Sequence, residues 1–512
     1  MFANLTSLAG FDHPPILFLL QLLPAAGAGA LLLIRREAWI FPLAVGVGVL
    51  ELAGAIELFH LYDPLMSGWQ WVEHQPLVGF FAYSAAADGM TVLFMLLTAF
   101  LTLMAVVYGR VRPFAPRNRF FAAVLASEAA LMTQFATLDL LWFVLFSGVQ
   151  TVLAGYLMHT WSDAPEEGPA LTGYYQFMGI GHVLLLAGTI LLGWIHADAL
   201  HQGWRFDLPA LMGAPIPILF QGSLFFLLFY GFGVRIPLFP LHGWLPAVAE
   251  HGTVAPALVF ILGLKTGFFG LLRFVFPLLP GAVEQWSPYA AAFAAAGIFY
   301  AALLALMQGN LRRMMAYAVV SHTCIVTLGL FSLHSHAFLG SILLIANFGL
   351  AAATLFFMVG LVNRRTHTAV LDRLGGLFDR LPWIGLAFFA GGWAIVAMPG
   401  TPGFDAAHLM LEAAIHRFGA LVTIAAALGN VTSASFLLWS FQRVFLAPPP
   451  EGAIAPRDLP QAVFLENLMA FSMIFLLLTA GFFSDPWLQL VESTANALAE
   501  PYAGVHAAGE VP

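Results

Sequence analysis

Residues 255–272 read APALVFILGLKTGFFGLL, an apolar stretch in which Lys265 is the only charged side chain. It is also the only lysine among the 19 lysine and arginine residues of the chain. A buried lysine can lose its proton, whereas an arginine effectively cannot. The use of arginine everywhere else, and of lysine where a charge is hardest to keep, therefore predicts a lysine that titrates.

Composition identifies the class of protein around this stretch. Hydrophobic residues make up 61% of the chain and charged residues only 9%, and apolar runs long enough to cross a bilayer recur along its length. We therefore predict an all-α polytopic membrane protein. No basic block suggests a nucleic-acid partner, and the single Cys324 excludes an intrachain disulfide and a cysteine-based metal site. No motif indicates a catalytic nucleophile, a metal or another cofactor, so we expect no catalytic site of the chain's own.

The apolar runs and the residues that interrupt them predict about fourteen transmembrane helices. The N-terminus lacks the features of a cleaved signal, so insertion is expected to start with the first hydrophobic helix. The predicted helices begin near residues 15, 39, 85, 119, 139, 174, 217, 254, 287, 314, 337, 383, 415 and 463.

Two of these helices contain proline in mid-element, the seventh around Pro237 and Pro240 and the twelfth around Pro399 and Pro402. Proline removes a backbone donor and clashes with the preceding turn, so both helices should be broken. Broken helices five spans apart fit two inverted five-helix repeats, helices 4–8 and 9–13. The predicted organisation is residues 1–118 for helices 1–3, 119–280 and 281–445 for the repeats, and 446–512 for the last helix and an outward-facing tail.

The arginines give the orientation. If consecutive helices alternate in direction, only Arg205, Arg273 and Arg417 fall on one side. By the positive-inside rule the other side is cytoplasmic, and both termini then face outward. The arginines on the cytoplasmic side are Arg35, Arg36, Arg110, Arg112, Arg117, Arg119, Arg312, Arg313, Arg364, Arg365, Arg373, Arg380, Arg443 and Arg457.

Ionisable groups inside membrane helices are costly and usually mark ion or proton paths. Some have a simpler interpretation: Asp88 and Asp139 can be helix caps, and His242 and His322 can be satisfied core histidines. Lys265 itself can form a structural ion pair with Glu128. The polar residues within the predicted helices are Asp88, Glu128, Asp139, Arg235, His242, Lys265, His322, Asn347, Asp405, His408 and Glu412.

Several motifs resemble the proton-pumping membrane subunits of respiratory complex I and their Mrp antiporter relatives. Tyr83, the pair Asp88–Gly89 and the ending 441–448 are most similar to the M-type subunit, and the chain lacks the long lateral helix of the L-type subunit. The matching stretches are GVRIPLFPLHGWLP at 233–246, GLKTG at 263–267, LLRF at 271–274, NLRRMMAY at 310–317, SH at 321–322, RTHT at 365–368, LGGL at 374–377, MPGTPGF at 398–404 and QRVF at 442–445.

The resemblance implies a mechanism. In the family a glutamate on the fifth helix pairs with a lysine on the broken seventh helix, and a central lysine on the eighth relays protons through histidines and water. Lys265 matches the central lysine, and Arg235 stands at the seventh-helix lysine, where arginine can tune a field but not easily carry a proton. The fifth-helix glutamate falls at Gly148, and Glu128 on the fourth helix is a hypothetical replacement.

The exit residues also depart from the family. The acid expected on the twelfth helix falls at Ala407, with Asp405, His408 and Glu412 nearby, and Asn347 stands near the expected eleventh-helix histidine. The predicted proton path consists of Lys265, His322, Glu128, Arg235, His242, Asp405 and His408.

These features lead to a function and to alternatives. The resemblance implies a proton-translocating subunit of a multi-subunit energy-coupling complex, such as a proton-pumping NADH–quinone oxidoreductase. Its implied partners are the other subunits of that complex, protons and lipid, in a bacterial inner (cytoplasmic) membrane. The departures keep two alternatives open: a proton-channel subunit of an inorganic-carbon uptake complex, a cation/proton antiporter or a membrane hydrogenase, and a non-conducting membrane scaffold. Lys265 favours conduction, and the missing fifth-helix acid favours the scaffold.

Overall fold

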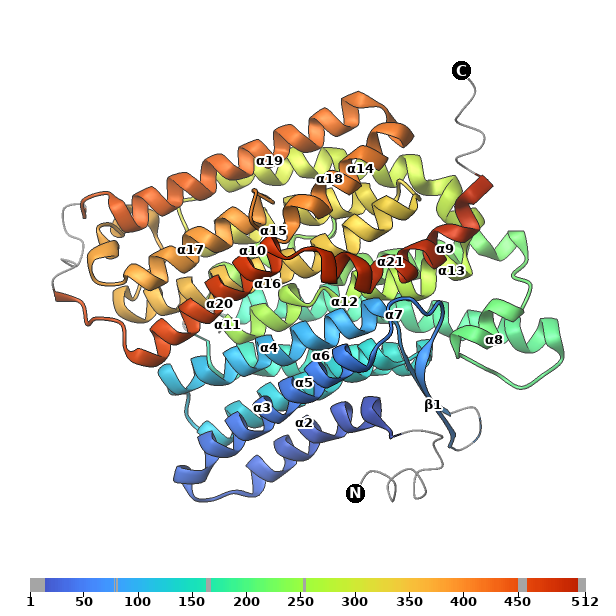
Figure 1. Cartoon of the computed structure of the whole chain (residues 1–512), viewed down its shortest axis with the longest axis horizontal. Coiled ribbons are helices and arrows are strands. Elements are labelled where there is room, and N and C mark those ends of the chain that lie inside the picture. The colour runs from blue at the N-terminus through green and yellow to red at the C-terminus, as the bar shows by residue number, and fades with distance from the viewer. Residues whose placement is uncertain are drawn as a thin grey trace.

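The computed structural model describes residues 14–77, 79, 82–162, 167–251, 255–449 and 458–504. The chain forms a bundle of long helices that run roughly along one direction, with the N-terminal helices at one side and α19 at the other (Figure 1). The last helices, α20 and α21, cross the face of the bundle. The two chain ends that were predicted to face outward, residues 1–13 and 505–512, lie outside the described residues.

The first seven predicted spans are all helical, and the seventh is divided. A short helix, α8 (Leu208–Gly213), lies between the sixth and seventh spans. The span helices are α2 (Ile16–Leu33), α3 (Glu37–Leu61), α4 (Gly89–Val111), α5 (Arg117–Ala136), α6 (Leu140–Thr160), α7 (Glu167–Leu200), α9 (Ile218–Arg235) and α10 (Trp244–Glu250).

The eighth span, which carries Lys265, is the most irregular helix of the bundle. It alternates between α-helical and wider π-helical turns, and π-helical turns inside α-helices often occur at functional sites. Its segments are α11 (Ala255–Leu258), a π-helical turn at Val259–Gly263, α12 (Thr266–Gly270), a second π-helical turn at Leu271–Val275 and α13 (Phe276–Leu278).

The remaining spans follow in the predicted order. A π-helical turn at Gln442–Leu446 continues α19, and three short 3₁₀ turns lie at Leu371–Arg373, Leu377–Asp379 and Glu500–Tyr502. The helices are α14 (Pro280–Leu306), α15 (Leu311–Leu330), α16 (Ser335–Thr366), α17 (Pro382–Ile395), α18 (Gly403–Phe418), α19 (Ala420–Phe441), α20 (Phe464–Phe482) and α21 (Asp485–Ala499).

The structure supports the predicted class and both breaks. Within the described residues, twelve helices are long and apolar enough to cross a membrane. The α5 helix and the short pair α17 and α18 are not among the twelve, so the total of fourteen stays a prediction. The seventh span is interrupted between α9 and α10, and the twelfth between α17 and α18, at the prolines that predicted these breaks. The repeat boundaries also remain a prediction.

A β-hairpin departs from the all-α prediction. Strand β1 (Gln70–Pro76) pairs antiparallel with β2 (Ala82–Ala87) between α3 and α4. The buried Glu73 of β1 accepts hydrogen bonds from the Leu17 and Phe18 backbone N–H groups, both at 2.9 Å. These donors belong to the first turn of α2 and have no acceptor within the helix, so the hairpin caps that helix.

The tail after the last span is also more ordered than predicted. It forms α21, which begins at Asp485–Pro486 and packs its apolar face, including Leu490 and Val491, against α4 and α16. The contact is close: a Cβ added at Gly89 would lie 1.8 Å from the Leu490 carbonyl oxygen. The helix is amphipathic, with apolar residues along one side and polar residues along the other, so its apolar side packs against the bundle.

Candidate functional site

Lys265 lies at a break in the backbone of the eighth span. It has φ 39° and ψ 49°, a left-handed conformation between the π-helical turn at Val259–Gly263 and α12. A residue other than glycine is rarely found there, and such strained residues cluster at functional sites. The break turns the Lys265 side chain away from the regular path of its helix, toward α15.

The ammonium group of Lys265 has a neutral partner. The side chain is 2% exposed, and its Nζ donates a hydrogen bond to the Thr323 hydroxyl at 2.7 Å. Thr323 in turn donates to the Val319 carbonyl oxygen at 2.7 Å. Among the residues that the structure describes, no ion pair joins Lys265 to a carboxylate, and the alternative of an ion pair with Glu128 is therefore not found. A buried amine without a carboxylate has little to hold its proton.

His322 stands next to Thr323 on α15. Its Nδ1 lies 2.7 Å from the Ala318 carbonyl oxygen, a contact in which the protonated nitrogen donates. Its Nε2 is buried, and the polar side chain near it is Asn430 on α19. The ring packs edge-on against Phe348 at 4.9 Å between centroids. The interpretation as a satisfied core histidine thus holds for one nitrogen only, and the other is open to accept a proton.

The break in the twelfth span lies on the far side of this histidine. Asn347 on α16 donates to the Ala394 carbonyl oxygen at 2.9 Å, and Asn430 on α19 donates to the Val396 carbonyl oxygen at 2.7 Å. Both carbonyls lie at the C-terminal end of α17. The Ala394 carbonyl also accepts from the Ala397 backbone N–H at 3.0 Å, so it is the Val396 carbonyl that depends on a side-chain amide at this break. The side-chain oxygens of both asparagines are buried; that of Asn347 has no partner among the described residues, and the Asn430 side chain lies near the His322 ring.

Arg235 ends α9 at the other break. Its Nη1 donates to the Ser147 carbonyl oxygen at 3.0 Å and to the Thr151 hydroxyl at 3.1 Å, and Nη2 lies 3.4 Å from Nδ1 of His182. A Cβ added at Gly148 would lie 2.8 Å from the His182 ring. The imidazole of His182 therefore lies beside Gly148, the position at which the resemblance predicted a fifth-helix glutamate, and Arg235 forms no ion pair within the described chain.

The other predicted path residues are less closely connected. His242 lies in the turn between α9 and α10, with Nδ1 buried and unpartnered and the ring near Phe239 and Tyr300. Glu128 is fully buried on α5, and no hydrogen bond or ion pair in the described part of the chain joins it to Arg235 or Lys265. The predicted pairing of Glu128 with Arg235 is thus not found, although a role for Glu128 stays open.

Asp405 and His408 follow the second break on α18. Asp405 is half-buried and lines a crevice of about 450 Å³ that also reaches Asn347 and Ser484. His408 and Glu412 are exposed, and Ala407, at the place of the family's acid, is half-buried. Asp405 thus shares this crevice with Asn347, whose neighbour in the chain, Phe348, packs against His322.

Asp88 and Asp139 act as the helix caps that the simpler interpretation predicted. Their carboxylates accept from the Thr91 and Trp142 backbone N–H groups, each at 2.9 Å. Asp88 also accepts from Arg273, at 2.7 Å and 3.0 Å. Burial raises the pKa of Asp88, but the Arg273 guanidinium and the Thr91 N–H outweigh this effect, so the pKa lies below its usual value.

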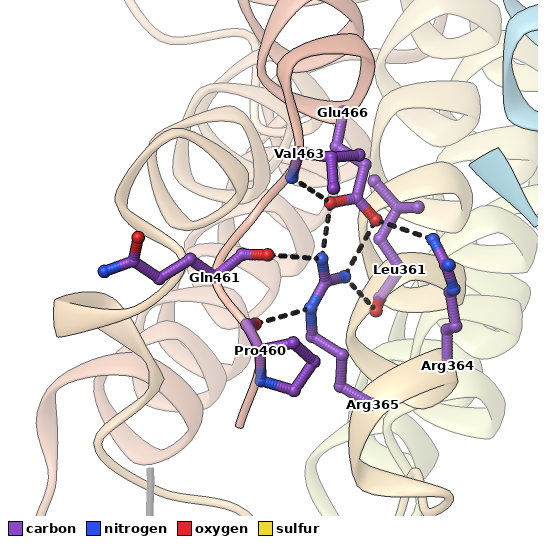
Figure 2. A network of polar contacts seen from close by, with 7 residues as sticks. All are labelled: Leu361, Arg364, Arg365, Pro460, Gln461, Val463 and Glu466. Carbon is purple, nitrogen blue, oxygen red and sulfur yellow. Dashed lines mark hydrogen bonds and ion pairs between the residues drawn. The ribbon is translucent and has the colours of Figure 1, made fainter. Parts of the chain in front are cut away.

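A second buried ion pair joins the last turn of α16 to the start of α20 (Figure 2). Arg365 donates to both oxygens of Glu466, one of them at 2.9 Å, and Arg364 donates at 3.1 Å. Glu466 also accepts from the Val463 backbone N–H at 2.8 Å, and Arg365 donates to the Pro460 carbonyl oxygen at 3.0 Å. Nearly every polar atom of this network has a partner, which is typical of a structural site.

Sequence reasoning missed three side chains of these sites. Thr323 and His182 look ordinary within their helices, and only the fold brings them to Lys265 and Arg235. Glu51 on α3 is different: it is a fully buried acid whose place in an apolar run was visible, and the rule that selected Glu128 selects it too.

The fold and these sites define a class: polytopic membrane proteins with two broken helices and a line of buried ionisable groups between them. The family described as "NADH:quinone oxidoreductase/Mrp antiporter, TM" matches residues 137–434, and the chain belongs to this family.

Known relatives agree with this membership. The chain is 28% identical over 500 residues to NAD(P)H-quinone oxidoreductase chain 4 1 of Synechococcus, covering 95% of this chain and 92% of the relative. It is 28% identical over 459 residues to NADH-quinone oxidoreductase subunit M of Rhodobacter capsulatus, covering 84% and 86%.

Solved structures give the same result. A chain of respiratory complex I from Thermus thermophilus superposes with a TM-score of 0.86 at 26% identity, covering 95% of this chain and 100% of the other. A chain of the Mrp complex from Dietzia superposes with a TM-score of 0.81, covering 96% of this chain and 98% of that one. At 18% identity, the second likeness concerns the fold alone.

Proposed function

We propose that this chain is a proton-translocating membrane subunit of a multi-subunit energy-coupling complex, of the M type found in NADH–quinone oxidoreductases. Membership of the family and the similarity to subunit M and chain 4 proteins over most of the chain support this proposal. Its partners would be the other membrane subunits of such a complex. The chain supplies the proton path rather than a redox centre.

The observation that carries the proposal is the environment of Lys265. The amine is buried, sits at a break in its helix and bonds to a hydroxyl rather than to a carboxylate. Desolvation then favours the neutral amine, while the Thr323 oxygen can still accept a hydrogen bond from the charged form. An amine held between its two protonation states can accept a proton from one side and release it to the other.

The neighbouring groups extend this site toward the second break. The buried Nε2 of His322, near the Asn430 side chain, can accept a proton, and the unpartnered side-chain oxygen of Asn347 can accept a hydrogen bond from a water chain. Asp405 lies along the crevice that reaches Asn347 and is the proposed exit. The exposed His408 would lie beyond it.

On the other side of Lys265, Arg235 would set the electric field. Its contacts with Ser147, Thr151 and His182 hold a fixed positive charge at the seventh-span break. His182 and His242 are the groups there that can exchange protons, because an arginine keeps its proton. Glu128 would contribute to proton binding from the fourth span.

We further propose that the chain lies in a bacterial cytoplasmic membrane with its arginine-rich loops inside and both termini outside. The distribution of arginines in the sequence supports this orientation. Epitope tags at the two termini, probed on spheroplasts whose cytoplasmic membrane is intact and accessible from outside, test it. Accessible tags are expected, and tags that react only after lysis would reverse the orientation.

The test of function is proton movement into vesicles that contain the whole complex. Lys265→Ala should reduce proton movement to that of vesicles without the complex, while the complex assembles normally. Thr98→Val is a matched control, because Thr98 is a buried hydroxyl that bonds only to its own helix, at 2.6 Å from the Phe94 carbonyl oxygen. Parent-level proton movement in an assembled Lys265→Ala complex would refute the relay.

One observation favours a second candidate, a non-conducting scaffold. Where the family has a carboxylate beside the seventh-span cation, this chain has Gly148 and His182 around Arg235. A scaffold needs no proton path, so the parent and Lys265→Ala would then give equal, background-level proton movement. Proton movement that the parent supports and Lys265→Ala abolishes excludes the scaffold.

A further inference from the structure

Two buried glutamates meet in the N-terminal part of the bundle, away from the break in the eighth span. Glu51 on α3 and Glu128 on α5 are both 0% exposed. Helices α3 and α5 pack against each other, and Val47, one turn before Glu51, and Leu125, just before Glu128, both lie against Gly27 of α2. Glu51 is therefore near enough for its negative charge to act on Glu128, and the Thr102 hydroxyl on α4 is near enough to donate to Glu128. Apart from this contact between Thr102 and Glu128, the four carboxylate oxygens and the Thr102 hydroxyl are buried without a hydrogen-bond partner in the described part of the chain. These five polar atoms come from three different helices.

The three side chains lie near mid-membrane. At a rise of about 1.5 Å per residue, Glu128 is ~16 Å along α5 from Arg117, and Glu51 is ~21 Å along α3 from Glu37. Thr102 lies ~14 Å from Val111, where α4 ends. The hydrocarbon core of a bilayer is about 30 Å thick, so both carboxyls are far from either aqueous surface.

No positive side chain is placed to neutralise this pair. The α2 helix, which packs on α3 and α5, has no ionisable residue. Within the described residues, no ion pair involves Glu51 or Glu128. Glu57 is exposed, and Glu73 is held by the α2 backbone at the outer end. On α3, α4, α5 and α6, the other acidic, basic and histidine side chains sit near helix ends; they are Glu37, Glu57 and His60 on α3, Arg110 on α4, Arg117 and Arg119 on α5, and His159 on α6.

Two ionised carboxylates cannot both persist in such a place. Each buried charge costs several kcal/mol even after relaxation, and like charges nearby add to that cost. A bound metal ion would need more ligands than two carboxylates and one hydroxyl supply, since hard cations take about six or more oxygens. A proton needs only one carboxylate oxygen, and it converts that group into a donor for the unpartnered oxygens around it.

We propose that Glu51 and Glu128 form a proton-binding site within α3, α4 and α5, distinct from the Lys265 site, in which at least one proton is held at neutral pH. Binding converts one carboxylate to a neutral carboxyl, whose O–H donates to the other glutamate or to Thr102. The inference does not rest on the proposed function, because the pair holds its proton whether or not Lys265 conducts.

Infrared spectroscopy of the full chain in its membrane complex tests this directly. The parent spectrum minus that of Glu51→Gln/Glu128→Gln should contain the carbonyl stretch of a neutral carboxyl, shifted in D₂O. The matched control is Glu57→Gln on the same helix. Because the Glu57 side chain is exposed, the difference spectrum of this substitution should show loss of ionised-carboxylate absorption instead. A double variant that loses only ionised-carboxylate absorption would overturn the proposal.

The remaining alternative is that the two glutamates bind a sodium ion instead of a proton, and adding sodium tests it. If added sodium replaces the neutral-carboxyl band of the parent with ionised-carboxylate absorption, the pair is a sodium site and the proton-binding proposal fails. A band that is unchanged by sodium but decreases as pH rises supports the proposal.

A labelling experiment on the parent alone covers the case in which the double variant does not fold. Dicyclohexylcarbodiimide is a small apolar reagent that adds to a neutral carboxyl and rearranges to a stable N-acylurea, whereas ionised carboxylates do not react. Mass spectrometry of the parent should find the adduct on Glu51 or Glu128, with less adduct at higher pH. The positive control is a membrane-buried carboxyl of a different protein in the same membranes that reacts with the reagent. If that control reacts and neither glutamate carries the adduct, the proposal is contradicted.

Discussion

Two groups of buried charges in this protein differ in how they are paired. At the ends of the helices, Arg365 with Glu466 and Arg273 with Asp88 form ion pairs in which a carboxylate accepts two or more hydrogen bonds. Near the middle of the bundle, Lys265 bonds to a neutral hydroxyl and Arg235 to a carbonyl, a hydroxyl and a histidine.

The difference in pairing distinguishes buried charges that stabilise the fold from buried groups that are suited to proton exchange. Pairing stabilises the ionised form of both side chains, so the helix-end pairs keep their charges and hold helices together. An unpaired amine or carboxyl can change its protonation at little cost, so the mid-membrane groups are suited to proton exchange. Substitutions of the first kind should therefore change stability, and those of the second kind should change proton movement.

The largest loss of stability is expected for Glu466→Gln. Removing this carboxylate leaves Arg365 as an uncompensated buried charge, which costs about 3–5 kcal/mol of unfolding free energy. Heat-induced unfolding of the purified protein measures the change. Asp372→Asn is the control, because the Asp372–Arg443 contact at 3.7 Å is largely solvent-exposed and should contribute little. Equal effects of the two substitutions would show that the network in Figure 2 does not join α16 to α20.

Asp88→Asn should have the next largest effect. Asparagine can still cap α4, so the main loss is the charged hydrogen bonds to Arg273, about 1.5–3 kcal/mol. Because the folded-state pKa of Asp88 lies below its unfolded value near 3.9, this contribution is present above about pH 4. It is lost as the pH falls through the folded-state pKa. Unfolding midpoints of parent and variant should converge in acid, and a constant difference across that range would argue against the ion pair.

Gly349→Ala should have a smaller effect on stability but should reach the lysine site. A Cβ at this position would lie 1.9 Å from the Gly263 carbonyl oxygen, so α16 and the π-helical turn before Lys265 must separate. We expect a loss of about 1–3 kcal/mol, as for overpacked cores, together with slower proton movement. Gly46→Ala on α3 is the control, because its Cβ would meet nothing within 4 Å. A Gly349→Ala protein as stable and active as the control would show that this close approach is unimportant.

The sequence predicted the parts of this fold that depend on local chemistry. Apolar runs predicted the helices, and mid-helix prolines predicted both breaks. For Asp88 and Asp139 the sequence left two interpretations open, and the structure shows the helix caps. The β-hairpin and α21 were not predicted, because each is stabilised by contact with distant helices. In the hairpin, Glu73 caps a helix more than fifty residues earlier in the chain.

The candidate site divides in the same way. The burial of Lys265 and the absence of an acid at Gly148 were readable from the chain. What replaces that acid was not readable, because His182 reaches Arg235 only through the packing of α7 on α6 and α9. The surroundings of Glu128 were not readable for a related reason: charge complementarity suggested a cation beside it, and the charged group that acts on it in the fold is Glu51.

The central claim is that Lys265 must release its proton, and Lys265→Arg tests it most directly. Arginine keeps the charge and much of the length of lysine but holds its proton under all ordinary conditions. Proton movement into vesicles, measured with the assembled complex, should fall to the level of Lys265→Ala, although the charge is retained. Proton movement at the parent rate in the Lys265→Arg complex would contradict the account, because it would show that a fixed positive charge is sufficient.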